Sequence, residues 1–392
     1  MTFVLTWLIG RLPIGWLQLQ HNRTRLLSAV GGVTFANVLI FMQLGFMGAL
    51  FESSVKAHRS WNADIVIASS DFRSIRELNP LPRARMFQAL AVDGVAEAEC
   101  LYVAPKTWTD PETGDTTTFR VTGVRPDAHA FKDERIQSQL HLLREGDVGL
   151  VDEGSRQFNP HISENIARDG VHQVEIAGRR LELRGLFHQG ASFDADGALV
   201  VSDQTFFRML PQFRAGTPSF ILVRCDAGAD VERVMADINA SFSEADARAF
   251  TMEGIVRAEQ SYQRRQTPIG FVFSFGIVIG FIVGLVMVYQ VLTTDVQDHL
   301  PEYATFKAIG YSSWYFLSVV FEEALSLATL GFFPGLMISL VLYHVAAEAT
   351  ALPITMPWTR PLMVSGFTLL MCTISGALAT RRLAQADPAD LF

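Results

Sequence analysis

The chain has 392 residues, a formal net charge of −8 and 49% hydrophobic residues. The acidic balance argues against nucleic acid as a partner, because nucleic-acid binding depends on basic surfaces. Residues 26–51 and 266–380 are mostly apolar, whereas residues 52–265 mix charged and apolar side chains as soluble domains do. This distribution predicts an α-helical membrane protein with one large soluble part.

The first 22 residues are apolar but are interrupted by Pro13 and Gly15. No basic segment precedes them and no small-residue cleavage site follows, so we do not expect a signal peptide. Trp7 and Trp16 are typical of a helix that lies in the membrane interface. We therefore predict an interfacial helix over residues 1–22; the alternative is a poorly ordered tail.

Four segments are long and apolar enough to cross a bilayer core of about 30 Å as helices. The first two include the charge-free runs 26–51 and 268–292. The predicted transmembrane helices are 23–51, 266–292, 313–347 and 362–381, with a short loop at 348–361 and a tail at 382–392.

The third of these segments has two unusual features. Pro334 lies inside it and is expected to kink the helix. Glu322 and Glu323 lie near its start. Carboxylates within a membrane are costly and often functional, but these two are close enough to the loop that we expect them to face the lipid headgroups.

The distribution of basic residues predicts the orientation in the membrane. The side that holds both termini carries Arg11, Arg23, Arg25, Lys307, Arg381 and Arg382 in short flanks. The short opposite loop, 348–361, holds only Arg360. By the positive-inside rule the termini and residues 293–312 are cytoplasmic. Residues 52–265 then form a single outer domain, on the opposite side of the membrane from the termini.

Alternating and helical patterns in residues 52–265 predict an α+β domain between the first and second transmembrane helices. Gly178 is expected in the turn of a hairpin. The last helix is expected to continue straight into the second transmembrane helix as a stiff stalk. Predicted strands are 63–68, 117–124, 148–152, 172–176, 180–186, 198–202 and 219–224, and predicted helices are 81–91, 231–242 and 252–265.

We find no catalytic motif. Gly-Lys does not occur, which excludes a phosphate-binding loop of the G-x-x-x-x-G-K-[ST] type, and neither H-E-x-x-H nor G-x-S-x-G is present. His188 lies near Asp194 and Asp196, a pattern more typical of a solvated loop than of a catalytic site. We therefore expect no catalytic residue, metal or cofactor on this chain.

Two of the three cysteines, Cys100 and Cys225, fall in the soluble part. A disulfide between them is possible in the periplasm, and the sequence leaves this open. Cys372 lies in an apolar run and is expected to be a small core residue.

Three glycines of the second transmembrane segment, Gly276, Gly280 and Gly284, are spaced four residues apart. Small residues on one helix face allow another helix to approach closely. The pattern predicts a packing or dimer seam. The partner helix can belong to the same chain or to a second copy.

The cytoplasmic segment 293–312 has the pattern of a short helix with an aromatic face. Leu300, Tyr303, Phe306 and Lys307 follow helical spacing. Pro301 suits the first turn and Gly310 the end of such a helix. An exposed aromatic face can dock on another protein or anchor in lipid, and the spacing alone does not decide between them.

Together these residues resemble a known family. The layout of one span, a large outer domain and three further spans is similar to the MacB/FtsX-type permeases of ATP-binding-cassette systems. Residues 301–311 resemble the cytoplasmic coupling element of that family, and residues 387–392 its usual ending. The DevC branch is most similar, on residues 16–19, 41–46, 62–66, 267–271 and 295–305, with a weaker match at 201–204.

The resemblance implies a permease subunit that works as a homodimer and binds two copies of a separate ATPase, which would hold ATP and Mg²⁺. The contact would comprise Glu302, Tyr303, Phe306, Lys307 and Gly310. In the DevC branch the assembly includes a periplasmic adaptor (membrane fusion) protein and a TolC-like outer-membrane channel. Many relatives carry Arg shortly before the Glu, where this chain has His299-Leu300-Pro301. Because of this departure, the substrates of lipoprotein or macrolide exporters are a poor guide to the substrate of this chain.

The resemblance thus implies an ATP-driven exporter subunit in a tripartite efflux assembly, with a glycolipid or another amphipathic molecule as cargo. The alternative is a mechanotransmitter that transports nothing and regulates a periplasmic partner. A membrane-anchored receptor is a third possibility, but it would give the coupling segment no role.

Overall fold

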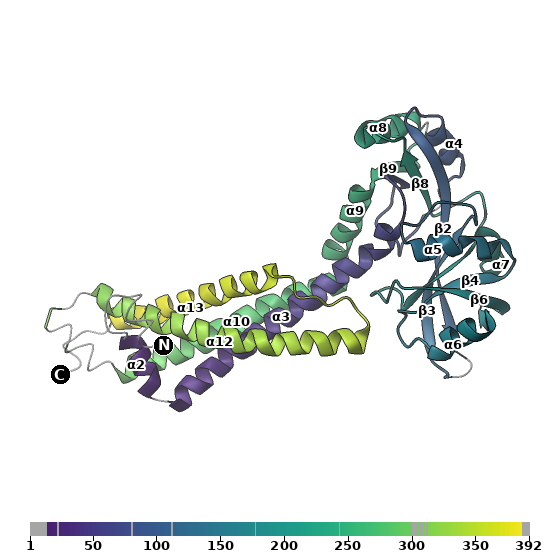
Figure 1. Cartoon of the computed structure of the whole chain (residues 1–392). Helices are drawn as coiled ribbons and strands as arrows, with labels where there is room; N and C mark the ends of the chain where they lie inside the picture. The colour runs from purple at the N-terminus through teal and green to yellow at the C-terminus, as the bar shows by residue number, and fades with distance from the viewer. Residues whose placement is uncertain are drawn as a thin grey trace. The chain divides into compact units, whose positions relative to one another are not determined.

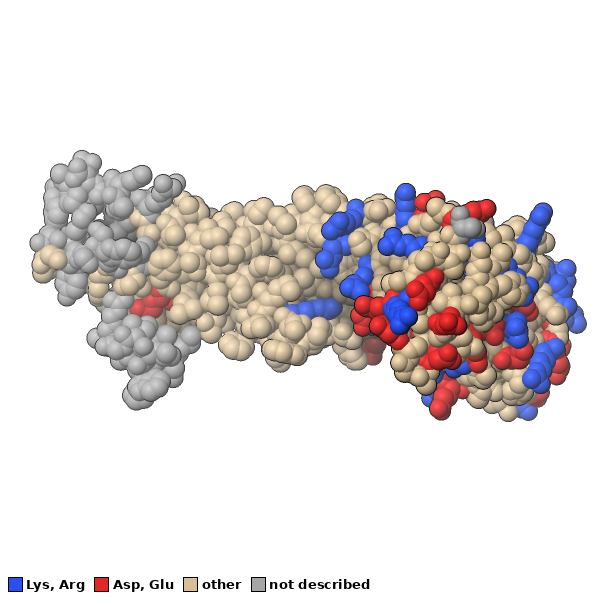
Figure 2. Space-filling model, turned by 90° about the horizontal axis from the view of Figure 1, so that it is seen from above, with Lys and Arg blue, Asp and Glu red and all other residues tan. Residues whose placement is uncertain are grey.

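The computed structural model describes residues 14–21, 23–79, 81–110, 113–176, 178–242, 244–299, 305, 309–310 and 313–385. The chain forms two compact units (Figure 1). The helical unit comprises Met1–Gly48, Phe271–Ala346 and Ile354–Phe392, and the mixed unit comprises Ala49–Gly270 and Ala347–Pro353. Charged side chains gather on the mixed unit, while the visible face of the helical unit is mostly uncharged (Figure 2).

Four long helices carry the apolar segments: α3 (Arg23–Ser60), α10 (Pro268–Asp298), α12 (Ser313–Thr350) and α13 (Thr359–Gln385). Each is long and apolar enough to cross a membrane. A short helix, α2 (Ile14–His21), precedes them. The predicted fold class, four transmembrane helices with a mixed domain between the first and second, is confirmed.

The long helices extend beyond the apolar runs that predicted them. α3 continues past Phe51 to Ser60, and α10 continues past Leu292 to Asp298. Backbone hydrogen bonds do not require apolar side chains, so a change in polarity does not end a helix. Residues 293–298, the first part of the predicted cytoplasmic segment, are thus a continuation of α10.

The stalk is also interrupted. α9 (Met252–Arg265) ends before α10 begins at Pro268, so the predicted continuous helix is wrong. Proline lacks an N–H donor and disfavours helical geometry in the residue before it. The Thr267 hydroxyl instead accepts a hydrogen bond from the Gly270 N–H at 3.3 Å, as a residue that caps a new helix does.

The mixed unit is built on a nine-stranded sheet with the order β5-β6-β4-β7-β3-β2-β8-β1-β9. Most neighbours are antiparallel, and β3–β7 and β4–β6 are parallel. The strands are β1 (Ile65–Ser69), β2 (Val95–Thr109), β3 (Thr116–Val124), β4 (Val148–Asp152), β5 (His172–Ile176), β6 (Arg179–Phe187), β7 (Gly197–Ser202), β8 (Phe220–Cys225) and β9 (Ala247–Thr251).

The helices of the mixed unit cover this sheet (Figure 1). In addition to α9 they are α4 (Ala84–Leu90), α5 (Glu134–Gln139), α6 (Pro160–Asp169), α7 (Asp203–Met209) and α8 (Val231–Ser241), with a 3₁₀ helix, η1 (Leu140–Arg144). Sequence patterns predicted seven of the strands but missed β2 and β9, and they missed α5, α6 and α7.

Strand β2 joins the two halves of the sheet. Its first part pairs with β8 and its second part, from Tyr102, pairs with β3. The strand contains Pro105, which cannot donate to a ladder, and charged residues that break the alternation of apolar side chains. Because of these features, sequence patterns alone did not predict this long strand.

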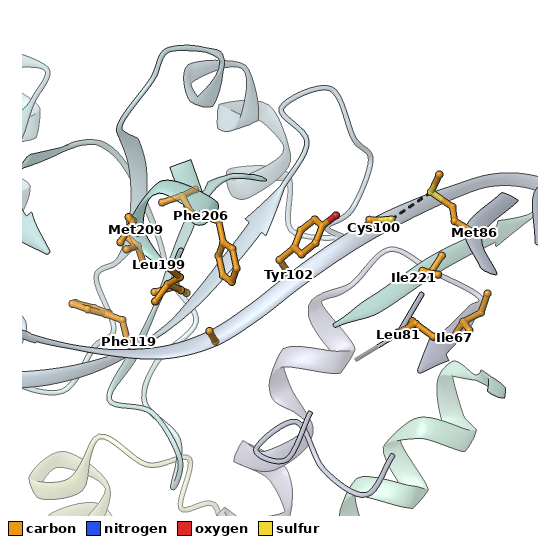
Figure 3. Close-up of a cluster of buried hydrophobic side chains, with 14 of the residues drawn as sticks. Ile67, Leu81, Met86, Cys100, Tyr102, Phe119, Leu199, Phe206, Met209 and Ile221 are labelled. Atoms are coloured by element: carbon orange, nitrogen blue, oxygen red, sulfur yellow. Dashed lines mark hydrogen bonds between the residues drawn. The ribbon is translucent and has the colours of Figure 1, made fainter. Parts of the chain in front are cut away.

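Successive side chains of β2 point to opposite faces and enter two separate cores. Cys100 and Tyr102 join one core, while Leu101 and Val103 join the other. In the first core Phe206 of α7 is fully buried, with its ring centroid 5.9 Å from Tyr102 and 5.4 Å from Phe213 (Figure 3). A Cβ at Gly123 would lie 2.6 Å from the Cβ of Phe206, so glycine is required there.

Phe206→Ala tests whether this aromatic cluster supports the domain. Truncating a fully buried phenylalanine should destabilise the protein by about 3–5 kcal/mol, through lost burial and a residual cavity. Thermal unfolding of the purified full-length protein measures the effect. Phe87→Ala on α4 is the control, because that side chain is 58% exposed and its loss should change stability by less than about 0.5 kcal/mol. Equal shifts in both variants would contradict this assignment.

Candidate functional site

Most of the predicted docking residues, Glu302, Tyr303, Phe306 and Lys307, lie outside the described residues. The end of the segment is described. The Ile309 N–H donates to the Thr305 carbonyl at 3.1 Å, the hydrogen bond of a helical turn. Gly310 has a φ of +105°, and a glycine with positive φ commonly ends a helix. The Ile309 side chain is 71% exposed, which leaves an apolar group available beside the predicted aromatic face.

The polar end of α10, which leads into this segment, is held by α3. Arg25 of α3 pairs with Asp298 and lies 3.4 Å from the Oδ1 atom of Asp295. His299 follows with its Nδ1 atom 2.9 Å from the Asp295 carbonyl. The first two transmembrane helices are therefore fastened to each other directly before the cytoplasmic segment.

Glu322 and Glu323 are both buried, so the prediction that they face lipid headgroups is wrong. Helix α2 packs over this part of α12. The Trp16 N–H donates to the Oε1 atom of Glu322 at 3.4 Å, and a Cβ at Gly15 would lie 2.8 Å from the Glu323 Cγ atom. The sequence could not show this arrangement, because it depends on α2 folding back onto α12.

The glycine face of α10 receives α3 of the same chain. A Cβ at Gly276 would lie 2.4 Å from the Gln43 side chain, and one at Gly280 would lie 2.9 Å from the Ile40 side chain. One at Gly284 would lie 2.4 Å from the Met371 sulfur of α13. This arrangement is the close backbone approach that small residues permit. A role of these glycines in dimerisation stays a prediction.

Hydrogen bonds join the membrane helices at further points. The Thr368 hydroxyl of α13 donates to the Asn37 side chain of α3 at 2.7 Å. The Thr34 hydroxyl donates to the Gly331 carbonyl of α12 at 3.2 Å, and the Ser375 hydroxyl donates to the Leu285 carbonyl at 2.7 Å. Such bonds stabilise helix association in lipid. Each of the four long helices is thus tied to a neighbour within the chain.

His188, Asp194 and Asp196 do not assemble into a site. Asp194 pairs with Arg120 at 2.6 Å and Asp196 with Arg156 at 2.5 Å, so the acids are held in ion pairs rather than solvated. Burial alone would raise the pKa of Asp194, but Arg120 lowers it below its ordinary value. Across the part of the chain that the structure describes, no group of three or more His, Cys, Asp or Glu could hold a metal ion.

Cys100 and Cys225 are free thiols. Both lie on the paired strands β2 and β8, but Cys100 is opposite Ile221 whereas Cys225 is opposite Val95. The register separates them along the strands, so a disulfide cannot form without rearranging the sheet. Burial raises the pKa of the Cys100 thiol to about 11.

Comparisons with known proteins assign the C-terminal part of the chain. Residues 273–388 match the family model described as the FtsX-like permease C-terminal domain. No functionally curated protein matches the chain.

Three solved structures show weak similarity. The first is the extracellular domain of the noncanonic ABC-type transporter YknZ from Gram-positive bacteria, with 12% identity and a TM-score of 0.34 over 48% of this chain and 100% of that one. The second is the periplasmic region of MacB from Actinobacillus actinomycetemcomitans, with 11% identity and a TM-score of 0.31 over 52% and 93%. The third is a domain of a putative permease from Porphyromonas gingivalis, with 14% identity and a TM-score of 0.31 over 48% and 88%. Likeness at this level carries no functional conclusion.

The matched residues begin in α10 and extend through α12 and α13. With its four membrane helices the chain is a multi-pass inner-membrane protein whose large domain lies in the periplasm.

Gly280→Leu tests the seam between α3 and α10. The added side chain has no space against Ile40, so the variant should lose about 1–3 kcal/mol of stability or more. Gly31→Leu is the matched control, because a Cβ at Gly31 of α3 would meet nothing within 4 Å. Thermal unfolding and cross-linking between copies are measured together. A variant that keeps its stability but loses cross-linking would place the glycines at a dimer interface instead.

Asp194→Asn tests the ion pair with Arg120. The variant should be less stable at pH 7 by about 1–3 kcal/mol, because a largely buried arginine loses its charged acceptor. Since the pKa of Asp194 is lower in the folded protein, this stabilisation is complete above the unfolded-state pKa of about 3.9 and declines as the pH falls through the folded-state value. The difference from wild type should therefore shrink below about pH 4. Asp169→Asn, at an exposed pair with Arg168, is the control and should change nothing at any pH. A pH-independent difference would refute the assignment.

Proposed function

We propose that this chain is the permease subunit of an ATP-driven ABC exporter whose energy comes from a separate ATPase subunit. The observation that carries the proposal is the FtsX-like permease domain over residues 273–388. The 392 residues contain no G-x-x-x-x-G-K-[ST] phosphate-binding loop, and in this proposal the motor is a separate subunit. ATP and Mg²⁺ would then be bound by that partner.

The ATPase would dock on the coupling segment through Glu302, Tyr303, Phe306, Lys307 and Gly310. Two features of the described structure support a role in transmission. The segment follows directly after α10, and the Arg25 pairs fasten the end of α10 to α3. A force applied to the segment would thus act on the first two membrane helices together.

The end of α12 also belongs to the periplasmic domain. Residues Ala347–Pro353, which follow the membrane part of α12, group with the mixed unit. There the Nε atom of Arg156 donates to the Thr350 carbonyl at 3.0 Å, while its Nη1 atom pairs with Asp196. The end of α12 is therefore held within the mixed unit by this arginine.

The remaining parts of the proposal rest on the family resemblance of the sequence. They are a homodimer of this chain, two ATPase copies, a periplasmic adaptor, a TolC-like channel and an amphipathic cargo such as a glycolipid. Lipid and metabolite profiling of a strain that lacks the gene would identify the cargo.

A second candidate function is a mechanotransmitter that moves no cargo and regulates a periplasmic partner. Helices α3 and α12 each run from the helical unit into the mixed unit, and this continuity of the chain is common to both functions. An accumulated compound in the deletion strain would favour export. A changed activity of a periplasmic enzyme without any accumulated compound would favour the mechanotransmitter.

Phe306→Asp tests the docking segment. A charged group on the predicted aromatic face should abolish co-purification of the ATPase, because an apolar contact cannot form around an unpaired carboxylate. Co-purification of the tagged permease with the ATPase measures the effect, and thermal unfolding checks that the variant folds.

Trp358→Asp is the matched control. Trp358 is an exposed aromatic residue of the short loop before α13, on the opposite side of the membrane from the coupling segment. This variant should retain the ATPase at the wild-type level. If Phe306→Asp also retains it, the docking surface lies elsewhere.

A further inference from the structure

A fully buried carboxylate lies where α10 and α12 pack against each other. Glu323 has no exposed surface, and neither of its carboxylate oxygens has a hydrogen-bond partner. The charged group that acts most strongly on it is the Asp295 carboxylate of α10, which lies within reach of a side-chain hydrogen bond. Asp295 is 2% exposed, and its Oδ2 atom also lacks a hydrogen-bond partner.

An independent polar group faces the same place. Ser326 lies three residues after Glu323, one turn further on the same face of α12. It is buried, and its hydroxyl has no hydrogen-bond partner. The packing of Leu292 and Val296 with Val320 and Ala324 closes the contact between α10 and α12 around these groups.

Among the charged groups that act on Glu323, Arg25 acts less strongly than Asp295 and Glu322 do. The Arg25 guanidinium of α3 lies 3.4 Å from the Oδ1 atom of Asp295, and it also forms an ion pair with Asp298. His299 of α10 lies 3.5 Å from Asp295 Oδ2. Glu322 of α12 adds negative charge and accepts from the backbone of α2.

Two carboxylates in contact within a buried site cannot both be ionised at low cost. One proton between them removes the repulsion and supplies the missing donor, since a protonated carboxyl group donates to an ionised one. Unlike a metal cation, a proton needs no additional space in this closely packed site.

We propose that Glu323 and Asp295 bind one shared proton, with the Glu323 carboxyl group donating to Asp295 Oδ2. The site is a hydrogen bond between α12 and α10 at the end of the helical unit that leads into the cytoplasmic segment. Separation of the two helices would expose both acids to water and release the proton. The site does not depend on the proposed export function.

Infrared spectroscopy of the full-length protein in lipid nanodiscs tests the proposal. At pH 7 the wild type should show the carbonyl stretch of a protonated carboxylic acid that is absent from Glu323→Gln. Comparison of the two proteins isolates this group from other buried carboxyls such as Glu259. Glu322→Gln is the matched control and should retain the band, because Glu322 is held by the Trp16 N–H.

Thermal unfolding gives a second readout. The new side-chain amide in Glu323→Gln can still donate to Asp295, so this variant should keep the melting temperature at pH 7, whereas Glu323→Ala should lower it. Raising the pH removes the shared proton and leaves two adjacent buried charges. The wild type should therefore lose melting temperature at alkaline pH more steeply than Glu323→Gln does.

Two results would overturn the proposal. The first is an unchanged acid band in Glu323→Gln. The second is a wild type without such a band that is stabilised by added Na⁺ or K⁺, which would identify a site for a metal cation instead of a proton.

Discussion

The close contact of α3 with α10 is the constraint on which the rest of the helical unit depends. Helices in lipid gain little from burying apolar surface against each other, so their association requires close packing. The three glycines of α10 provide it by admitting Gln43, Ile40 and Ala36 of α3. This register also brings Arg25 to the acidic end of α10. The helix that enters the periplasmic domain and the helix that returns from it are thereby joined along the membrane.

Inside the periplasmic domain, the end of α3 contacts helix α9, which leads back to α10. The last turns of α3 belong to the mixed unit, where His58 is fully buried against Trp61. Its Nε2 atom lies 4.0 Å from the Oε2 atom of Glu259 on α9. Burial raises the pKa of Glu259, although its carboxylate accepts hydrogen bonds from Ser74 and from the Ile75 N–H. Helix α9, which precedes the break at Pro268, is therefore anchored in the domain through Glu259.

These contacts fit the proposed function, in which the chain transmits movement. The contacts are the buried acids of α10 and α12, the glycine seam of α10 and the Arg156 contact at the end of α12. Each is a polar or close-packed contact that specifies one arrangement, whereas the apolar surfaces around them do not. Transmission of movement needs such specific contacts, because uniform apolar packing would let the helices slide.

Residue composition alone predicted the four membrane helices, since a run of about 20 apolar residues has few other stable solutions than a membrane-spanning helix. It also predicted strands such as β4 and β5, whose short apolar or alternating runs are local patterns. Strand β2 was missed because its pairing with β3 and β8, not its own sequence, makes it a strand. The burial of Glu322 and Glu323 was predicted wrongly because it depends on α2 and α10, which are distant in sequence. The glycine spacing predicted a packing face on the second membrane helix but did not show which helix packs against it.

Local sequence patterns thus determined which segments form helices and strands. Only the tertiary structure decided which charges are buried together and which helix packs against the glycines, since both depend on contacts between distant parts of the chain.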